Sequence, residues 1–214
     1  MKSLHKPGLF SWSEFNAQRN IDFNSFFIQG KPIMNTLDPF FSGEMENIVI
    51  DPLPLSDHDK AHIRALGGID WILLSNSDHC RAAAEIAVEF EARIAGPKAE
   101  SANFPIVIDR WLSDGDVFMR LQVRELKGSK TPGELCFRYG STLFTGDLIR
   151  AHKPGELIAL PAQKLRDPLA AARSIQDLDS EGVDTVLVGD GWHLFGGGAE
   201  AIDALCQSLL ERYK

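Results

Sequence analysis

The sequence contains few cysteines, lacks long apolar runs and has fewer basic than acidic residues. Its 214 residues include three cysteines, at positions 80, 136 and 206. That number is small, odd and widely spaced, which excludes a disulfide framework. No apolar run approaches the roughly 18 residues of a membrane-spanning helix, and the first ten residues, MKSLHKPGLF, lack the apolar centre of a signal peptide. These absences predict a cytoplasmic protein without a membrane partner.

The charge balance and the absence of linkers narrow the class further. Lys and Arg total 22 against 30 Asp and Glu, a net charge of −8 with a pI near 5.2. Such a chain is unsuited to a nucleic-acid partner, so we expect a small-molecule substrate. No Pro-, Gly- or Ser-rich stretch divides it, which predicts one domain over residues 1–214. The oligomeric state is left open, with a homodimer as one option.

Hydrophobic periodicity predicts alternating runs of strands and helices. We expect strands over residues 21–28, 47–51, 69–74, 117–123, 135–139, 142–145 and 185–188, and helices from Ser56 to Gly67-Gly68 and over residues 79–92, 168–178 and 199–212. Residues 29–46 form a long loop, which either caps a site or packs onto the core. Consecutive strands with helices between some of them indicate a layered α/β protein with mixed sheets.

Acidic residues, once with a histidine, follow four of the expected strands. Asp51 ends one strand, Asp78-His79 follow the next buried one, Asp147 ends the sequence LFTGD, and Asp190 follows TVLVG. Strand ends are where a rigid scaffold presents catalytic or binding groups. Each Asp taken alone is more typical of a helix cap or turn than of a site. The four together indicate a site.

These segments, taken in order, resemble the motifs of the metallo-β-lactamase superfamily, particularly glyoxalase-II-like hydrolases. The pieces are the strand ending at Asp51, the segment LSNSDH at 74–79 in place of H-x-H-x-D-H, the turn SKTPG at 129–133, LFTGD at 143–147, and GDG at 189–191. The resemblance covers the chain from about Asn24 to its end. It implies an αβ/βα sandwich: two mixed β-sheets with helices outside.

The resemblance also implies which metal ligands are kept. Family members bind the first metal through histidines that are Leu74, Asn76 and Lys130 here, so this site is lost. For the second site the ligands would be Asp78, His79, Asp147 and Asp190, the last in place of a histidine. Three carboxylates and one imidazole suit one divalent ion, with Mn²⁺, Mg²⁺ or Fe²⁺ competing with Zn²⁺.

Lys130 stands where the first metal would lie, and we interpret it as a substitute for that charge. The three ligand carboxylates carry −3, Lys130 returns +1, and a divalent ion would bring the cluster to zero. The alternative is a solvated turn lysine. Three further residues are weaker candidates for binding substrate: Asn76, His193 and Arg150, the last together with His152. A local turn bond for Asn76, a packed position for His193 and a surface position for Arg150 remain open.

The resulting hypothesis is a single-metal hydrolase of ester or thioester bonds. Lys130 and Asp78 are its expected catalytic residues, with Lys130 stabilising the developing oxyanion. The alternative is a non-catalytic member of the fold, either a pseudoenzyme or a small-anion binding module. Because fold does not determine function, the geometry of the site has to distinguish these two hypotheses.

Overall fold

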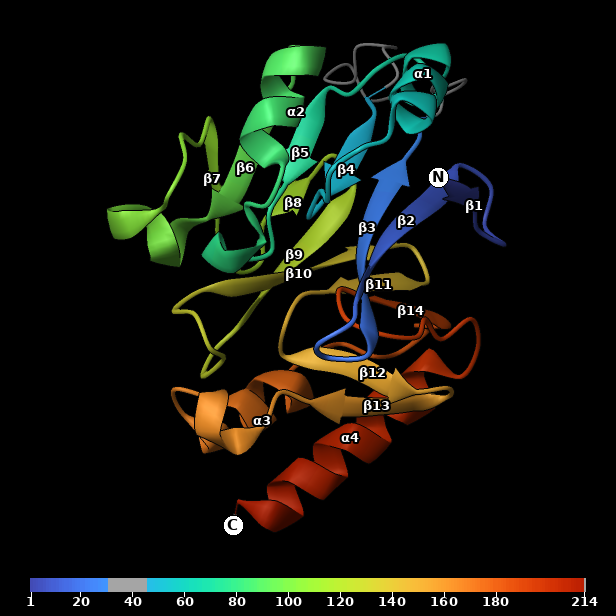
Figure 1. Ribbon diagram of the computed structural model, residues 1–214. Coiled ribbons are helices and arrows are strands. Elements are labelled where there is room, and N and C mark those ends of the chain that lie inside the picture. The colour runs from blue at the N-terminus through green and yellow to red at the C-terminus, as the bar shows by residue number, and fades with distance from the viewer. Residues whose placement is uncertain (31–45, 214) are drawn as a thin grey trace, which may run out of the picture.

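A computed structural model describes residues 1–30 and 46–213 of the chain, so most of the predicted loop 29–46 lies outside the described residues. The chain forms two mixed β-sheets with helices on their outer faces, which confirms the expected architecture (Figure 1). The first sheet has seven strands in the order of the chain: β1 (Lys2–Ser3), β2 (Leu9–Asn16), β3 (Ile21–Ile28), β4 (Ile48–Ile50), β5 (Trp71–Leu73), β6 (Arg93–Pro97) and β7 (Arg110–Leu112). Strands β1 to β4 pair antiparallel and β4 to β7 parallel.

The second sheet has five strands in the order β14-β11-β10-β9-β8. Their bounds are β8 (Val117–Phe118), β9 (Leu121–Leu126), β10 (Glu134–Tyr139), β11 (Thr142–Thr145) and β14 (Thr185–Val188). Only the β11–β14 pair is parallel. A separate hairpin joins β12 (Ile149–Lys153) to β13 (Glu156–Ala159) and lies beside the second sheet (Figure 1).

Three apolar clusters hold these layers together. The central cluster lies between the sheets, where Phe26 of β3 meets Phe144 of β11 with ring centroids 5.3 Å apart. The second covers the outer face of the first sheet with α1 (Asp57–Ala65) and α2 (Ala83–Phe90). The third packs α3 (Pro168–Gln176), α4 (Gly198–Arg212) and the β12–β13 hairpin onto the outer face of the second sheet. This arrangement is the expected αβ/βα sandwich.

Most predicted elements are present with ends shifted by a few residues. The helix that begins after Ser56 is confirmed, because the Ser56 side chain accepts a hydrogen bond from the Asp59 N–H in the ordinary capping position. Within the described residues, no helix is long and apolar enough to cross a membrane.

Two predicted elements were wrong in extent. The helix expected over residues 79–92 begins only at Ala83, because Arg81 has a positive φ of 33° that helical backbone does not allow. The strand expected over residues 117–123 is a tight hairpin, in which Met119 and Arg120 have φ values of 50° and 69° and separate β8 from β9. Because apolar residues continue to alternate through that turn, the hydrophobic pattern predicts one continuous strand there.

Candidate functional site

The candidate site lies where the carboxyl ends of strands from the two sheets meet. Asp51 follows β4, Ser75 follows β5 after one intervening residue, and Gly146-Asp147 follow β11. The two sheets approach so closely here that a Cβ on Gly146 would lie 2.7 Å from Ser75 Oγ. A side chain at position 146 would therefore push the strand ends apart, which is why the turn before Asp147 requires glycine.

The buried carboxylate of Asp51 fixes the orientation of the His79 ring. The Nδ1 atom lies 2.8 Å from Asp51 Oδ2 and 2.9 Å from Ser75 Oγ. Ser75 itself donates its N–H and its hydroxyl to the two Asp51 oxygens, each at 2.7 Å. Because Nδ1 is engaged by Asp51, the other ring nitrogen, Nε2, faces Asp147 Oδ1 at 3.7 Å. From the sequence, Asp51 was grouped with the other strand-end acids but was not included among the expected metal ligands or catalytic residues.

From Asp51 the charges alternate in sign toward the surface. The Lys130 Nζ lies 3.1 Å from Asp147 Oδ2 and 2.5 Å from Asp78 Oδ2. We call Asp51, His79, Asp147, Lys130 and Asp78 the charge row. Its inner end is buried, since Asp51 is 1% exposed, whereas the Asp78 side chain at its outer end is 49% exposed. Lys130 thus bridges two of the carboxylates predicted to hold a metal.

Contacts within the charge row shift the pKa values of His79, Asp147 and Lys130 toward their charged forms. Burial disfavours the His79 cation, but Asp51 and Asp147 outweigh it and raise the pKa of His79 to about 9. Burial likewise opposes the Asp147 anion, yet His79 and Lys130 hold the pKa of that carboxyl well below its usual range. The two aspartates also raise the pKa of Lys130 against its partial burial. At neutral pH these three side chains carry full and opposite charges.

Glu134, which lies beneath the charge row, behaves differently. It is fully buried and accepts hydrogen bonds from the Leu148 N–H, at 2.8 Å, and from the Ser129 hydroxyl. Burial and the nearby Asp147 raise the pKa of Glu134 to about 8. Sequence reasoning missed this residue, because a glutamate at the start of an apolar strand carries no motif signal.

Asp190 takes a different partner from the other predicted ligands. Its Oδ2 accepts a hydrogen bond from Arg150 Nη2 at 2.9 Å, and its Oδ1 is buried without a hydrogen bond. Gly189 instead lies over His79, because a Cβ there would be 3.4 Å from His79 Cε1. Successive residues of an extended chain face opposite sides, so Asp190 turns from the charge row toward Arg150 of β12.

The weaker candidates have local roles in the structure. Asn76 is buried and its Oδ1 accepts the Asp78 N–H at 3.0 Å, closing the turn that presents Asp78 and His79. His193 packs against Phe26, with ring centroids 5.3 Å apart, and burial lowers the pKa of His193 to about 4. Arg150 is 5% exposed, so the surface position considered for it is wrong.

The fit of a divalent metal can be examined on these contacts. Across residues 1–30 and 46–213, no three His, Cys, Asp or Glu side chains are grouped so as to hold a metal ion. Lys130 stands between Asp78 and Asp147, and Arg150 engages Asp190. In this arrangement the four expected ligands do not fit a resident divalent ion, because protein cations already face the carboxylates.

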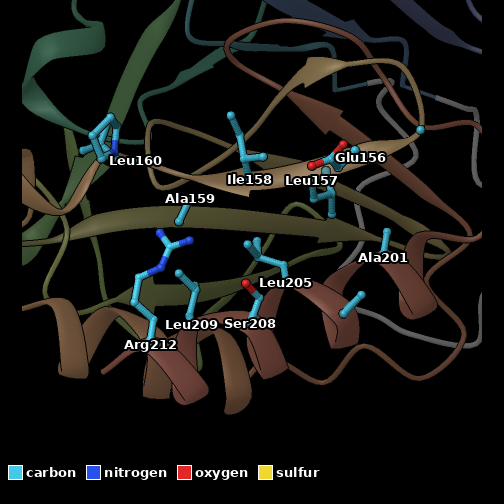
Figure 2. A pocket seen from close by; sticks show the side chains of 13 residues that line it. Glu156, Leu157, Ile158, Ala159, Leu160, Ala201, Leu205, Ser208, Leu209 and Arg212 are labelled. Carbon is cyan, nitrogen blue, oxygen red and sulfur yellow. The ribbon is translucent and has the colours of Figure 1, made fainter. Parts of the chain in front are cut away.

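Two cavities lie near the β12–β13 hairpin. One, of about 380 Å³, runs between β13 and α4, and Figure 2 shows Leu205, Ser208 and Leu209 of the helix facing the strand. The other, of about 330 Å³, is bounded by Arg19 of the β2–β3 turn and by Arg150 and His152 of β12. Figure 2 also shows that the Ile158 side chain, which borders both cavities, points away from α4.

Comparisons with known proteins agree with this architecture. The family profile described as "Metallo-beta-lactamase superfamily" matches residues 1–209. The comparison with curated proteins gives no match.

Solved structures match over nearly the whole chain. The metallo-beta-lactamase family protein TTHA1429 from Thermus thermophilus is 15% identical with a TM-score of 0.70, covering 97% of this chain and 81% of that one. The metallo-beta-lactamase FIM-1 from Pseudomonas aeruginosa, described in its mono-zinc form, is 11% identical with a TM-score of 0.67, covering 99% and 95%. TTHA1623, described in a di-iron-bound form, is 18% identical with a TM-score of 0.63, covering 91% and 98%. At these identities the likeness establishes the fold, in which relatives bind zinc or iron.

Proposed function

The chain belongs to the metallo-β-lactamase superfamily, and we propose that it is a member that binds a small molecule without a resident metal and without hydrolysing it. The observation that carries this proposal is the position of Lys130. Its ammonium lies within 3.1 Å of carboxylate oxygens of both Asp78 and Asp147. A positive charge from the protein is therefore already present between two residues that would bind the ion.

Electrostatics supports the exclusion of a second cation. Two unit charges 4 Å apart interact by about 4 kcal/mol at an effective dielectric of 20, so a divalent ion beside the ammonium would be repelled by about 8 kcal/mol. A metal would thus have to displace Lys130 from Asp78 and Asp147.

Hydrolysis without a metal would need a general base, and the charge row offers none. His79 and Lys130 hold their protons at neutral pH, and Asp147 is a weak base because its pKa is low. Burial raises the pKa of the Cys80 thiol to about 12, which makes it a poor nucleophile. A base with a pKa near the working pH is the usual requirement for proton transfer. Glu134 has a pKa of about 8, but it is fully buried and its oxygens accept hydrogen bonds from Ser129 and the Leu148 N–H, so it does not face a substrate. These features support binding without turnover.

A second candidate is the single-metal ester or thioester hydrolase, with Zn, Mn or Fe as its ion. One observation favours it: His79 donates Nδ1–H toward Asp51 and directs Nε2 at Asp147, which is the orientation that carboxylates impose on metal-binding histidines. In that case Asp78, His79 and Asp147 would hold the ion after Lys130 moved aside, and the ion would activate water. Lys130 and Asp78 would then face the substrate.

Elemental analysis separates the two candidates. Untagged protein from cells supplied with zinc and manganese is purified without chelators, beside Asp147→Asn and a surface control, Asp203→Asn. We expect far less than one equivalent of any divalent metal in all three. Hydrolysis of p-nitrophenyl acetate and of an acyl thioester should not differ between wild type and Asp147→Asn. About one ion per chain in the wild type and the control, absent from Asp147→Asn, would overturn the metal-free proposal.

A further inference from the structure

The smaller of the two cavities is basic, although the protein as a whole is acidic. It holds about 330 Å³ and lies between the β2–β3 turn and the β12–β13 hairpin. Among the described residues that line it, four are basic and none is acidic: Arg19, Arg150, His152 and Lys164. In a chain of net charge −8, such a gathering of bases around one cavity indicates an anionic ligand.

Arg150 is a buried lining residue of this cavity, and its side chain is held in place by its neighbours. Its side chain is 5% exposed and is held by two contacts, Nη2 with Asp190 Oδ2 at 2.9 Å and Nε with His152 Nε2 at 3.1 Å. These contacts use two of the five N–H donors of a guanidinium. A guanidinium locked in this way loses little conformational freedom when an anion binds, which favours binding.

The charged side chains described around the cavity have a net charge of +2. Arg19, Arg150 and Lys164 contribute +3, and Asp190 behind Arg150 contributes −1. His152 adds no charge at neutral pH, because burial and the Arg150 cation lower the pKa of His152. It accepts the Arg150 N–H instead. Arg19 and Lys164 are exposed at the rim of the cavity, where the Arg19 guanidinium lies 5.6 Å from the centroid of the Phe23 ring.

We propose that this cavity binds a small phosphate monoester. Its dianion matches the net charge of +2, and guanidinium groups bind phosphate oxygens through paired hydrogen bonds. The organic part of the ligand would lie on Ile21 and Ile158, which line the apolar side of the cavity. A volume of about 330 Å³ is at the small end of the range for ligand sites. This inference names the class of ligand for the proposed function. It rests on the proposed function in one respect, namely that the bound ligand is not hydrolysed.

Calorimetric titration with phenyl phosphate tests the site directly. The key variant is the double substitution Arg19→Gln and Lys164→Gln, because both side chains are exposed and their removal leaves the buried Arg150–Asp190 pair intact. The matched control is Lys98→Gln with Arg173→Gln, which removes the same charge from exposed positions away from the cavity. Because the key variant lacks two charge-assisted interactions with the phosphate, its binding should be about 10- to 100-fold weaker.

The outcomes distinguish the site from the wider function. We expect the wild type and the control to bind phenyl phosphate alike, more tightly than inorganic phosphate or benzoate, and the key variant to bind it at least about tenfold more weakly. Absence of wild-type binding, equal binding by the key variant, or benzoate binding as tight as phenyl phosphate would overturn the phosphate site. Release of phenol during the titration would leave the site standing and would contradict binding without hydrolysis.

Discussion

Asp147 of the charge row and Arg150 of the basic cavity of about 330 Å³ are three residues apart in the chain, but the two regions differ in how their charges are paired. In the charge row each cation lies between two carboxylates, so that Lys130 contacts both Asp78 and Asp147. In the cavity one carboxylate, Asp190, serves the buried Arg150, and the other bases face open space. The first region is balanced internally, whereas the second has positive charge left for a ligand.

This difference shows that the positions of motif residues do not by themselves indicate where a ligand binds. Asp51, Asp78, His79 and Asp147 of the charge row match the family motifs and Lys130 replaces a motif histidine, but the charges of these residues are paired within the protein. Arg150 and its neighbours match no motif, yet they leave cations unmatched. The following predictions test the contrast, beginning with the largest effect.

Removing the central carboxylate of the charge row should be the most damaging change. Asp147→Ala would leave the His79 and Lys130 cations without the buried group that separates them. We expect a loss of about 4 kcal/mol in the free energy of unfolding, typical of breaking one side of a buried ion pair. Urea unfolding measures it. A neutral or stabilising effect would mean that the charge row is not balanced as described.

Breaking the pair behind the cavity should cost somewhat less. Arg150→Gln strands the buried Asp190 carboxylate, with an expected loss of about 3 kcal/mol. Adding Asp190→Asn removes that unpaired charge, so the double variant should recover part of the loss. A double-mutant cycle by urea unfolding gives the coupling energy. Additive losses would show that the two side chains do not depend on one another.

The pKa values of two histidines should depart in opposite directions from the ordinary histidine value of 6.5. The pKa of His79 is raised to about 9, and that of His152 is lowered. Because the folded pKa of His79 exceeds its unfolded value near 6.5, its stabilisation is fully present below about pH 6.5 and is lost as the pH rises through about 9.

The size of that loss is roughly 3 kcal/mol, because each unit of pKa shift corresponds to about 1.4 kcal/mol. Heteronuclear NMR titration measures the pKa of each histidine ring. Urea unfolding of wild type and His79→Gln, from about pH 6 to about pH 10, isolates the contribution of His79 to the free energy of unfolding. A His79 ring that is neutral at pH 7 would contradict the charge row and favour a metal ligand instead.

The outer end of the charge row should matter least. Asp78 is half exposed, so Asp78→Asn removes a solvent-screened contact with Lys130 and should cost only about 0.5 kcal/mol. The comparison with Asp147→Ala under the same conditions provides the scale. An effect as large as that of Asp147→Ala would indicate that Asp78 has a further role.

Much of the fold follows from sequence patterns, because the central strands and four helices are strongly periodic. Strands such as β3, whose bounds are as expected, and the Ser56 cap depend on local chemistry. The hairpin at Met119-Arg120 does not, since two non-glycine residues adopt positive φ there. The β12–β13 hairpin was not anticipated either, although it forms one wall of both cavities.

The candidate site was predictable only in part, for a geometric reason. Asp78, His79, Asp147 and Lys130 were identified from motif order, and the structure places them in one chain of contacts. The partner of Asp190 could not be inferred, because a one-residue alternation decides which side of the chain it faces. Arg19 and Lys164 are brought to the cavity by separate turns that no spacing connects.

The central claim is that Lys130 supplies the charge that a metal supplies in relatives. Thermal unfolding with and without added Zn²⁺ and Mn²⁺, on wild type, Lys130→Gln and the exposed control Lys127→Gln, tests it most directly. We predict that the metals leave the wild type and the control unchanged, and that Lys130→Gln melts lower and is restabilised by metal, because Asp78 and Asp147 then lack their cation. A wild type stabilised by several degrees, with Lys130→Gln no more responsive, would contradict the claim.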